Sequence, residues 1–302
     1  MSNINTKKLQ KILVIVGPTA SGKTSLSIKL AKKFNGEVIS ADSRQVYKGM
    51  DIGTGKVTKK EMQGIKHYLL DVVSPNTQFN AAKFVKLGDK AIKEITQKGK
   101  LPIICGGTGF WIDALLYGLP ETVAPDWELR KKLEKLTAIQ LLKKLRRVSP
   151  ERAKNIDPNN KRRLIRALEI ALKTKKPVPL TIRIIKYDAL KIGVLRNRQD
   201  LKKRIHNRLL ARMKQGMARE VANLHKNGVS WRRLDDFGLE YRFISRYLRG
   251  FISKEEMMTL LETAINQYAK RQNTWFKRDK EINWLNNEKN TVKLIKKRLF
   301  DK

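Results

Sequence analysis

The segment of this chain that most restricts its fold is a glycine-rich motif of eight residues near the start. It matches the phosphate-loop pattern G-x-x-x-x-G-K-[ST] and reads Gly17-Pro18-Thr19-Ala20-Ser21-Gly22-Lys23-Thr24. The apolar run at 11–16 before it is typical of a buried strand, and Leu26, Leu30 and Phe34 after it mark one face of a helix. This order of strand, loop and helix predicts an α/β fold with a P-loop NTPase-like core.

The composition of this loop suits the binding of phosphate groups. Its glycines let backbone N–H groups converge on phosphate oxygens, and the helix that follows directs its positive end at the anion. Lys23 adds a positive charge, and Thr24 can offer its hydroxyl to Mg²⁺. All eight residues are candidate ligands of a diphosphate unit. The compound stays open, because a kinase, an NTPase and a transferase that releases diphosphate could all use such a loop.

Strands and helices alternate along the first part of the chain. Strands are expected at 37–40, 68–73 and 101–105, and a helix at 82–98 ends before Gly99. Alternation of this kind predicts a parallel sheet that is covered by helices on both faces.

A helical segment interrupts this pattern after Pro120, and one of its helices, at 160–174, is expected to turn Leu164, Leu168 and Leu172 inward. A strand at 189–195 and long helices then return, and we expect the basic tail at 289–302 to fray. The expected units are a P-loop core of residues 1–120 and 187–302 and a helical insertion of residues 121–186.

Polar residues follow the next two strands that should lie beside the loop. Asp42 comes directly after the strand at 37–40, and because the carboxyl ends of parallel strands meet at the ligand crevice, it should lie near the phosphate loop. It could coordinate Mg²⁺, act as a base or only cap a helix, and Asp71 competes for the metal. The turn Gly106-Gly107-Thr108-Gly109 belongs to the same edge, where Thr108 could bind substrate or the glycines could form only a tight turn.

The charge of the chain favours a polyanionic partner. Lys and Arg number 66 against 28 Asp and Glu, a net charge of +38, although such an excess can also merely solvate a surface. The single cysteine, Cys105, excludes an intrachain disulfide and is expected to be a small buried hydrophobe. The sequence has no apolar stretch of about 18 residues and no signal-peptide core, so we expect a cytoplasmic protein without a membrane span.

Taken together and in order, the motifs resemble those of the bacterial tRNA dimethylallyltransferases, also called tRNA isopentenyltransferases. The resemblance extends from about residue 12 to residue 280 and is far more specific than the phosphate loop alone. The matching segments are Gly17–Thr24, Ser40-Ala-Asp-Ser43, Gln45-Val-Tyr47, Lys48-Gly-Met-Asp-Ile-Gly-Thr54, His67-Tyr-Leu-Leu-Asp71, Gly106-Gly-Thr108, Arg163-Leu-Ile-Arg-Ala-Leu-Glu169, Tyr268-Ala-Lys-Arg-Gln272 and Thr274-Trp-Phe276.

The resemblance implies transfer of a dimethylallyl group from dimethylallyl diphosphate to N6 of adenine 37 of tRNA, with release of diphosphate. It implies that Asp42 takes a proton from the adenine amine and that Thr19 contacts the bridging oxygen of the donor. Lys23 and Arg208 complete the implied catalytic set, with Mg²⁺ as cofactor. Arg204 and Arg208 stand where the family carries basic residues that can face the diphosphate, although a solvated helix face is the alternative.

The resemblance also implies which residues contact RNA. The partner is the anticodon stem-loop, the target base is extruded into the pocket, and the insertion grips phosphates. The protein is expected to work as a monomer. The implied tRNA-binding residues are Asp42, Ser43, Arg44, Gln45, Thr108, Arg130, Arg162, Arg163, Leu164, Ile165, Arg166, Lys270, Arg271 and Gln272.

Several positions depart from the family pattern, namely Gly55, Val57, Trp111 and the segment Gly238-Leu-Glu-Tyr-Arg242. The last of these departures concerns local tRNA contacts and not the chemistry. The zinc finger of eukaryotic relatives is absent from the sequence.

The main alternative is a small-metabolite kinase with the same loop. A nucleic-acid-binding protein without catalysis is disfavoured by the intact Lys23, Thr24 and Asp42. An enzyme that prenylates free adenylate is disfavoured by the basic insertion.

Overall fold

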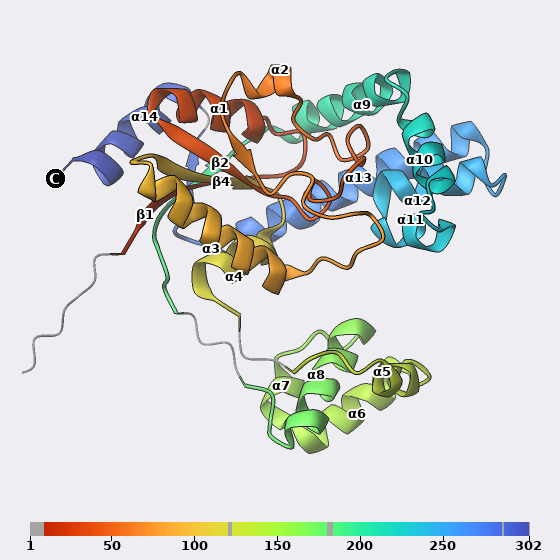
Figure 1. Cartoon of the computed structure of the whole chain (residues 1–302). Coiled ribbons are helices and arrows are strands. Elements are labelled where there is room, and N and C mark those ends of the chain that lie inside the picture. The colour runs from red at the N-terminus through yellow and green to blue at the C-terminus, as the bar shows by residue number, and fades with distance from the viewer. Residues whose placement is uncertain (1–8, 120–122, 180–183, 286, 302) are drawn as a thin grey trace, which may run out of the picture. The chain divides into compact units, whose positions relative to one another are not determined.

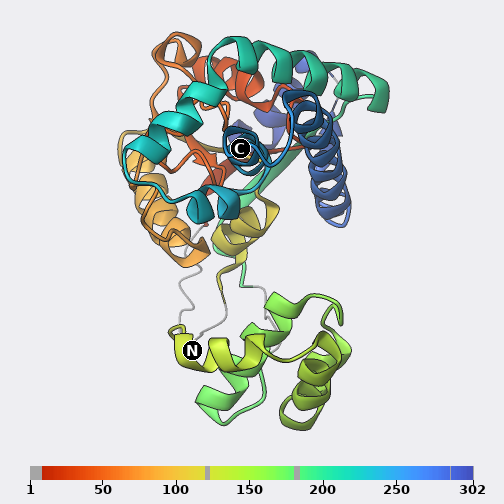
Figure 2. The same ribbon diagram turned by 90° about the vertical axis from the view of Figure 1, so that its right-hand side faces the viewer.

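The structure is a computed structural model that describes residues 9–119, 123–179, 184–285 and 287–301. Residues group into two compact units (Figures 1 and 2). The core unit comprises Met1–Tyr117 and Ile185–Lys302, and the insertion unit comprises Gly118–Ile184. The chain therefore leaves the core unit after Tyr117 and returns to it at Ile185. In the described part of the chain, no helix is long and apolar enough to cross a membrane.

The core unit is built on a six-stranded sheet in which every neighbouring pair is parallel, in the order β3-β2-β4-β1-β5-β6. The strands are β1 (Lys11–Val16), β2 (Gly36–Ala41), β3 (His67–Tyr68), β4 (Leu101–Gly106), β5 (Asp188–Val194) and β6 (Asn283–Leu285). Every residue of β2 and β4 is buried, as expected for parallel strands that are covered on both faces.

The register of the central strands brings their carboxyl ends to one level. Val16 pairs with both Gly106 and Gly193, and Ala41 also pairs with Gly106. The loops that follow β1, β2, β4 and β5 therefore begin side by side. These loops carry the glycine-rich motif, Asp42, the Gly106 turn and the chain toward Arg196.

Helices cover the sheet in the core unit (Figure 1). Leu13, Ile15 and Ile192 pack with residues of α1 and α14 in one apolar cluster, whereas α3 and α4 contact β4. The helices of this unit are α1 (Lys23–Lys33), α2 (Lys59–Met62), α3 (Ala81–Gln97), α4 (Gly109–Tyr117), α9 (Arg198–Lys214), α10 (Met217–Lys226), α11 (Trp231–Phe237), α12 (Leu239–Leu248), α13 (Lys254–Phe276), α14 (Glu288–Ile295) and the π-helix η1 (Lys296–Phe300).

Two expectations for this unit are wrong. The strand expected at 68–73 ends at Tyr68, because Leu69 and Asp71 adopt positive φ values of 63° and 53°, which turn the chain out of the sheet. The tail does not fray within its described residues: it forms α14 and η1, and the ring of Phe300 stacks on Phe34, the C-cap residue of α1, with centroids 5.3 Å apart.

All regular secondary structure among the described residues of the insertion unit is helical. Its helices are α5 (Trp127–Glu134), α6 (Ala138–Val148), α7 (Pro150–Lys154) and α8 (Lys161–Thr174). A Thr137–Gln140 capping box begins α6, and Leu141, Leu145 and Leu164 are fully buried in a separate small core. The inward position expected for Leu172 is wrong, since its side chain is 44% exposed beyond the end of that core.

Candidate phosphate site and its neighbours

The phosphate loop follows β1 and bends through three residues with positive φ: Gly17, Ala20 and Gly22. Gly17 has φ +150°, and a Cβ there would lie 3.2 Å from the carbonyl oxygen of Val194 in the strand next to it, so both the backbone and the packing favour glycine. Lys23 begins α1, and its Nζ donates a hydrogen bond of 2.6 Å to the carbonyl oxygen of Pro18. Burial lowers the pKa of Lys23 to about 8, so a bound anion would stabilise its charged form.

Three arginines from the segment after β5 surround the same loop. Arg196 Nε donates to the carbonyl oxygen of Ser21 at 3.0 Å, and Arg204 Nε donates to that of Ala20 at 2.8 Å. Arg208 Nη2 donates to the hydroxyl of Thr19 at 2.6 Å. Burial lowers the pKa of Arg208 to about 10, so it stays charged at neutral pH. With Lys23, these side chains make a strongly positive setting that fits a diphosphate.

The sequence pattern only partly identified this group. It placed Arg204 and Arg208 as candidates to face the diphosphate, and the structure brings both to the loop. Arg196 was missed. The available signal was its position, since a basic residue two places after a strand adjacent to β1 must lie near the loop that follows β1.

Asp42 lies at the carboxyl end of β2, as its place in the sequence predicted. Its Oδ1 accepts hydrogen bonds from the backbone N–H groups of Arg44 at 2.8 Å and Gln45 at 3.4 Å. Asp42 thus caps a turn and not a helix, since the next helix begins at Lys59, and its Oδ2 is without a hydrogen bond among the described residues. Burial lowers the pKa of both Lys23 and Arg208, while the negative charge of Asp42 opposes that shift. The Asp42 carboxylate therefore caps its own turn and also favours the charged forms of Lys23 and Arg208.

A tyrosine of α13 shares this corner. Burial and then the charge of Asp42 raise the pKa of Tyr268 above its usual range, so its hydroxyl stays protonated. In the sequence, Tyr268 stood out only as the first residue of the family-like segment Tyr268-Ala-Lys-Arg-Gln272.

The turn after β4 holds the Asp42 loop in place. Thr108 Oγ1 accepts from the backbone N–H of Ser43 at 3.1 Å, and the N–H of Thr108 donates to the carbonyl oxygen of Ala41 at 3.2 Å. A Cβ on Gly106 would lie 2.2 Å from that same carbonyl oxygen. The glycine thus permits the close approach of β2 and the turn.

Gln272 of α13 is buried, with 6% of its surface exposed, and contacts two of these loops. Its Oε1 accepts from the backbone N–H of Thr19 at 2.8 Å, and its Nε2 donates to the carbonyl oxygen of Gly107 at 2.9 Å. The polar atoms of this side chain are therefore occupied inside the protein, and its implied role in tRNA binding stays a prediction.

Other residues implied at the RNA surface also hold the protein together. Arg44 Nε donates to the carbonyl oxygen of Phe237 at 2.8 Å, and Gln45 Nε2 donates to that of Gly55 at 3.2 Å. Asp71, the competing metal candidate, instead accepts a hydrogen bond of 2.6 Å from the buried Lys56. That ion pair gives Asp71 a structural partner, and its role as a metal ligand stays a prediction.

A clamp on the loop before α2 was not expected from the sequence. The carboxylate of Glu220 accepts from the backbone N–H groups of Asp51, Ile52 and Gly53 at 2.6–3.0 Å. Gly55 next to it has φ +58°, and a Cβ there would lie 1.6 Å from Nη2 of Arg212. Gly55, which departs from the family pattern, therefore leaves the space that the guanidinium of Arg212 occupies. Only the fold brings these segments together, so no local pattern signals the clamp.

The implied tRNA residues of the insertion unit divide into two groups. Arg162 and Arg163 are exposed at the start of α8. Arg130 and Arg166 both bond to the buried carboxylate of Glu169. The side chains of Leu164 (0% exposed) and Ile165 (6%) lie in the core of the unit, and their implied contact with RNA stays a prediction. In the core unit, Lys270 and Arg271 are exposed.

A metal site made by the protein alone is absent from the described residues, which contain no group of three or more His, Cys, Asp or Glu side chains suited to an ion. Thr24 is exposed in the first turn of α1. Mg²⁺ usually takes one or two protein ligands together with substrate phosphates, and an exposed Thr24 hydroxyl with a diphosphate fits that requirement.

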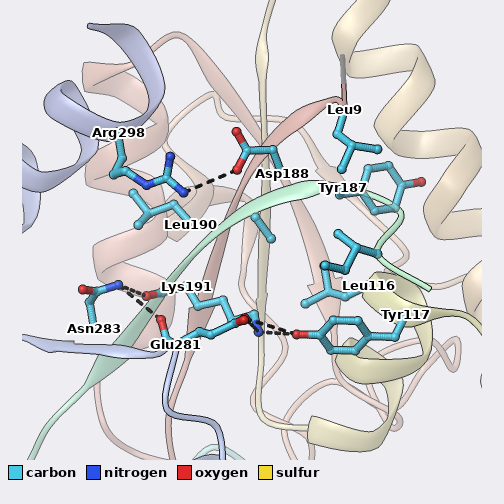
Figure 3. A pocket seen from close by; sticks show the side chains of 12 residues that line it. Leu9, Leu116, Tyr117, Tyr187, Asp188, Leu190, Lys191, Glu281, Asn283 and Arg298 are labelled. Carbon is cyan, nitrogen blue, oxygen red and sulfur yellow. Dashed lines mark hydrogen bonds and ion pairs between the residues drawn. The ribbon is translucent and has the colours of Figure 1, made fainter. Parts of the chain in front are cut away.

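A second cavity, of about 400 Å³, lies near β5 and differs from the phosphate site in its charges (Figure 3). There Lys191 Nζ donates to Tyr117 and, at 2.7 Å each, to Asp279 and Glu281, and Arg298 faces Asp188. Although burial alone would lower it, these hydrogen bonds raise the pKa of Lys191. Because its cations are already paired, this cavity carries no comparable demand for an anion.

Known proteins of one kind match this chain. A family profile described as IPP transferase matches residues 45–279. A tRNA dimethylallyltransferase of Acetivibrio thermocellus is 43% identical over 291 residues, which cover 93% of this chain and 93% of the relative. A tRNA dimethylallyltransferase of Bacillus cytotoxicus is 45% identical over 288 residues, covering 92% of this chain and 90% of the relative.

Solved structures agree with these matches. A tRNA delta(2)-isopentenylpyrophosphate transferase of Staphylococcus epidermidis superposes with a TM-score of 0.71 at 41% identity, covering 96% of this chain and 99% of the other. A eukaryotic dimethylallyltransferase acting on tRNA has a TM-score of 0.78 at 26% identity, covering 96% of this chain and 76% of the other. From its profile match, its identity to curated relatives and its fold, the chain belongs to the IPP transferase family.

Proposed function

We propose that this protein transfers a dimethylallyl group from dimethylallyl diphosphate to N6 of adenine 37 of tRNA and releases diphosphate. The observation that carries the proposal is the convergence of Asp42 with Lys23 and Arg208 at the phosphate loop. A cationic cradle for a leaving group thus stands beside a carboxylate that can accept a proton. These are the two groups that an alkyl transfer to an amine requires.

In the proposed reaction, the C–O bond between the allyl carbon and the diphosphate breaks while a C–N bond to the adenine amine forms. The electron pair of the broken bond stays on the diphosphate. Lys23 and Arg208 stabilise that charge, and the Thr19 hydroxyl, held by Arg208 at 2.6 Å, is proposed to contact the bridging oxygen. The P-loop backbone from Gly17 to Thr24 binds the remaining oxygens.

The proton leaves the other reactant. As the new C–N bond forms, the amine becomes cationic, and we propose that Oδ2 of Asp42 accepts its proton. Oδ1 is already engaged by the N–H groups of Arg44 and Gln45, which fixes the orientation of the carboxylate. The hydroxyl of Tyr268, neutral at physiological pH, lies close enough to Asp42 for the charge of this carboxylate to raise the pKa of Tyr268.

Mg²⁺ is the proposed cofactor, held by the Thr24 hydroxyl and by the diphosphate of the substrate. When bound, it would neutralise part of the negative charge on the leaving group. Four cations of the protein around the loop are proposed to stabilise the leaving group in addition to Mg²⁺: Lys23, Arg196, Arg204 and Arg208.

The anticodon stem-loop of tRNA is the proposed partner. The net charge of +38 supports it, and the exposed Arg162, Arg163, Lys270 and Arg271 are available for phosphates. The insertion unit is proposed to grip the stem. Because the proposed substrate is tRNA, we expect the protein to work in the cytoplasm, and we expect a monomer, which gel filtration tests.

Mass spectrometry of tRNA tests the proposal. Unmodified tRNA is incubated with the protein, Mg²⁺ and dimethylallyl diphosphate, then digested to nucleosides. The expected product is an adenosine heavier by one dimethylallyl group, formed with an equal amount of diphosphate. A parallel incubation with ATP in place of the donor tests the kinase alternative, which the relatives do not favour. Unmodified tRNA together with ATP consumption would reject the transferase.

A further inference from the structure

A cavity of about 710 Å³ lies in the core unit between α9 and α13, next to the carboxyl end of β5. Its lining includes no Asp or Glu among the described residues. Five of its lining side chains are cations: Arg196, Arg198, Lys202, Lys270 and Lys277. This sign imbalance separates it from the cavity near Lys191, where carboxylates share the lining.

The cations of this cavity are largely without partners. Arg196 stands 3.8 Å from Asp200, whereas the other four form no ion pair with the described residues. Like charges gathered on one cavity repel each other, and an anion of high charge density removes that repulsion. Arginine and lysine donate several hydrogen bonds to phosphate oxygens and accept none.

Arg196 connects this cavity with the phosphate loop. Its Nε donates to the carbonyl oxygen of Ser21 at 3.0 Å, and its Nη2 lies 3.6 Å from the place that a Cβ on Gly22 would occupy. The cavity therefore lies next to the diphosphate site and shares Arg196 with it, whereas on α13 Gln272 contacts the loop while Lys270 and Asn273 line the cavity.

The rest of the cavity lining can form hydrogen bonds and apolar contacts with a ligand. Asn266, Gln267 and Asn273 offer amide groups, and the ring of Trp284 supplies an apolar surface. We propose that this cavity is a second phosphate-binding site beside the phosphate loop. The proposal rests on the proposed function, because that function supplies two sources of phosphate. These are a phosphodiester of the bound tRNA and a free diphosphate, as donor or product.

The test reverses two cations of the cavity that do not touch the loop, in the variant Lys202→Glu with Lys277→Glu. The matched control, Lys90→Glu with Lys93→Glu on the exposed side of α3, changes the net charge equally. One arm measures the Kd for tRNA across salt concentrations. The other titrates inorganic diphosphate into the protein by calorimetry.

If RNA is the source, the cavity variant should bind tRNA at least about tenfold more weakly, with a salt slope smaller by about one to two, while the control changes less. If free diphosphate is the source, the wild type should show a second, weaker binding event that the cavity variant loses. Wild-type affinity and slope for tRNA together with unchanged diphosphate binding would overturn the proposal. Should the double reversal fail to fold, Lys202→Gln with Lys277→Gln is measured instead, with half the change in charge.

The wild type is assayed for dimethylallyl transfer in the same preparation. Transfer by the wild type with unchanged binding by the cavity variant would reject the second site and leave the proposed function standing. Absence of transfer by the wild type would reject the proposed function itself.

Discussion

The side-chain oxygen of Gln272 accepts a hydrogen bond of 2.8 Å from the backbone N–H of Thr19, so a residue of α13 holds the phosphate loop directly. Through its amide nitrogen the same side chain also holds Gly107, in the turn after β4. A Cβ on Gly107 would lie 2.2 Å from that nitrogen, so the glycine and the glutamine depend on each other. Gln272 thereby fixes the distance between the leaving-group loop and the turn that supports Asp42.

Replacing Gln272 tests this positioning role. In Gln272→Glu, the carboxylate can still accept from Thr19, but it cannot donate to Gly107 and it adds a negative charge beside the diphosphate. We expect kcat to fall about 10- to 100-fold, corresponding to the 1–3 kcal/mol of one unsatisfied buried group. The Kd for tRNA should stay within about threefold. A rise in that Kd with unchanged kcat would instead support the tRNA contact that the family resemblance implied.

Asp42→Asn separates the two roles of Asp42. Asparagine keeps an oxygen that can accept from the N–H groups of Arg44 and Gln45, but it cannot take a proton. Single-turnover transfer should therefore fall about 10²- to 10⁴-fold, the usual contribution of a general base, while tRNA binding persists. Asp42→Ala removes the cap as well and should also reduce thermal stability. Transfer by Asp42→Asn at the wild-type rate would exclude Asp42 as the base.

The sheet and the phosphate loop followed from local patterns, because the strand at 11–16, the eight-residue motif and the helix after it lie next to each other in the chain. Asp42 and Thr108 also fell where strand order predicted. The roles of Gln272 and Glu220 could not be predicted, since their partners lie 253 and 167–169 residues away in the sequence. The tail was misjudged for the same reason: its helices are stabilised by packing on α1.

The low pKa of Lys23 predicts proton uptake when an anion binds. Folding lowers this pKa from its ordinary value of 10.5 to about 8, so near pH 8–9 much of the free enzyme has a neutral Lys23. A bound diphosphate should restore the charge, and calorimetry in buffers of different ionisation enthalpy should detect a proton taken up. Lys23→Met should lose this uptake, which separates it from the ionisation of the ligand. Equal uptake by both proteins would assign the proton elsewhere.

The same shift has a consequence for stability. A buried cation whose pKa is lowered disfavours the folded state most below about pH 8, and this penalty disappears as the pH rises toward 10.5. Lys23→Met should therefore melt at a higher temperature than the wild type at pH 7 and at a similar one at pH 10.5. A variant that is less stable at pH 7 would contradict the burial of the charged lysine.

Glu169 should make the insertion unit sensitive to acid. Burial alone would raise its pKa, but hydrogen bonds from Arg130, from the N–H of Asp126 and from Arg166 lower it below 4.5. Its stabilisation is therefore complete above about pH 4.5 and disappears as the pH falls through the lower, folded-state pKa. Hydrogen exchange in α8 should accelerate in that window in the wild type. In Glu169→Gln it should already be faster at pH 7, by the equivalent of about 1–3 kcal/mol, with α3 as internal reference.

The exposed arginines at the start of α8 provide the sharpest test of RNA binding by the insertion unit. Arg166 is a poor target, because its removal also breaks the hydrogen bond to Glu169. Arg162→Glu with Arg163→Glu changes only exposed side chains. We expect weaker tRNA binding and a salt slope reduced by about 0.9 for each phosphate that the variant no longer neutralises.

Lys143→Glu with Lys144→Glu provides a matched control, since it makes the same change in charge at exposed positions of α6 in the same unit. The two double variants should differ in slope if the arginines meet phosphates at defined places, because counterion release depends on which phosphates are neutralised and not on total charge. Equal slopes in both variants would mean that this unit attracts RNA only through its overall charge.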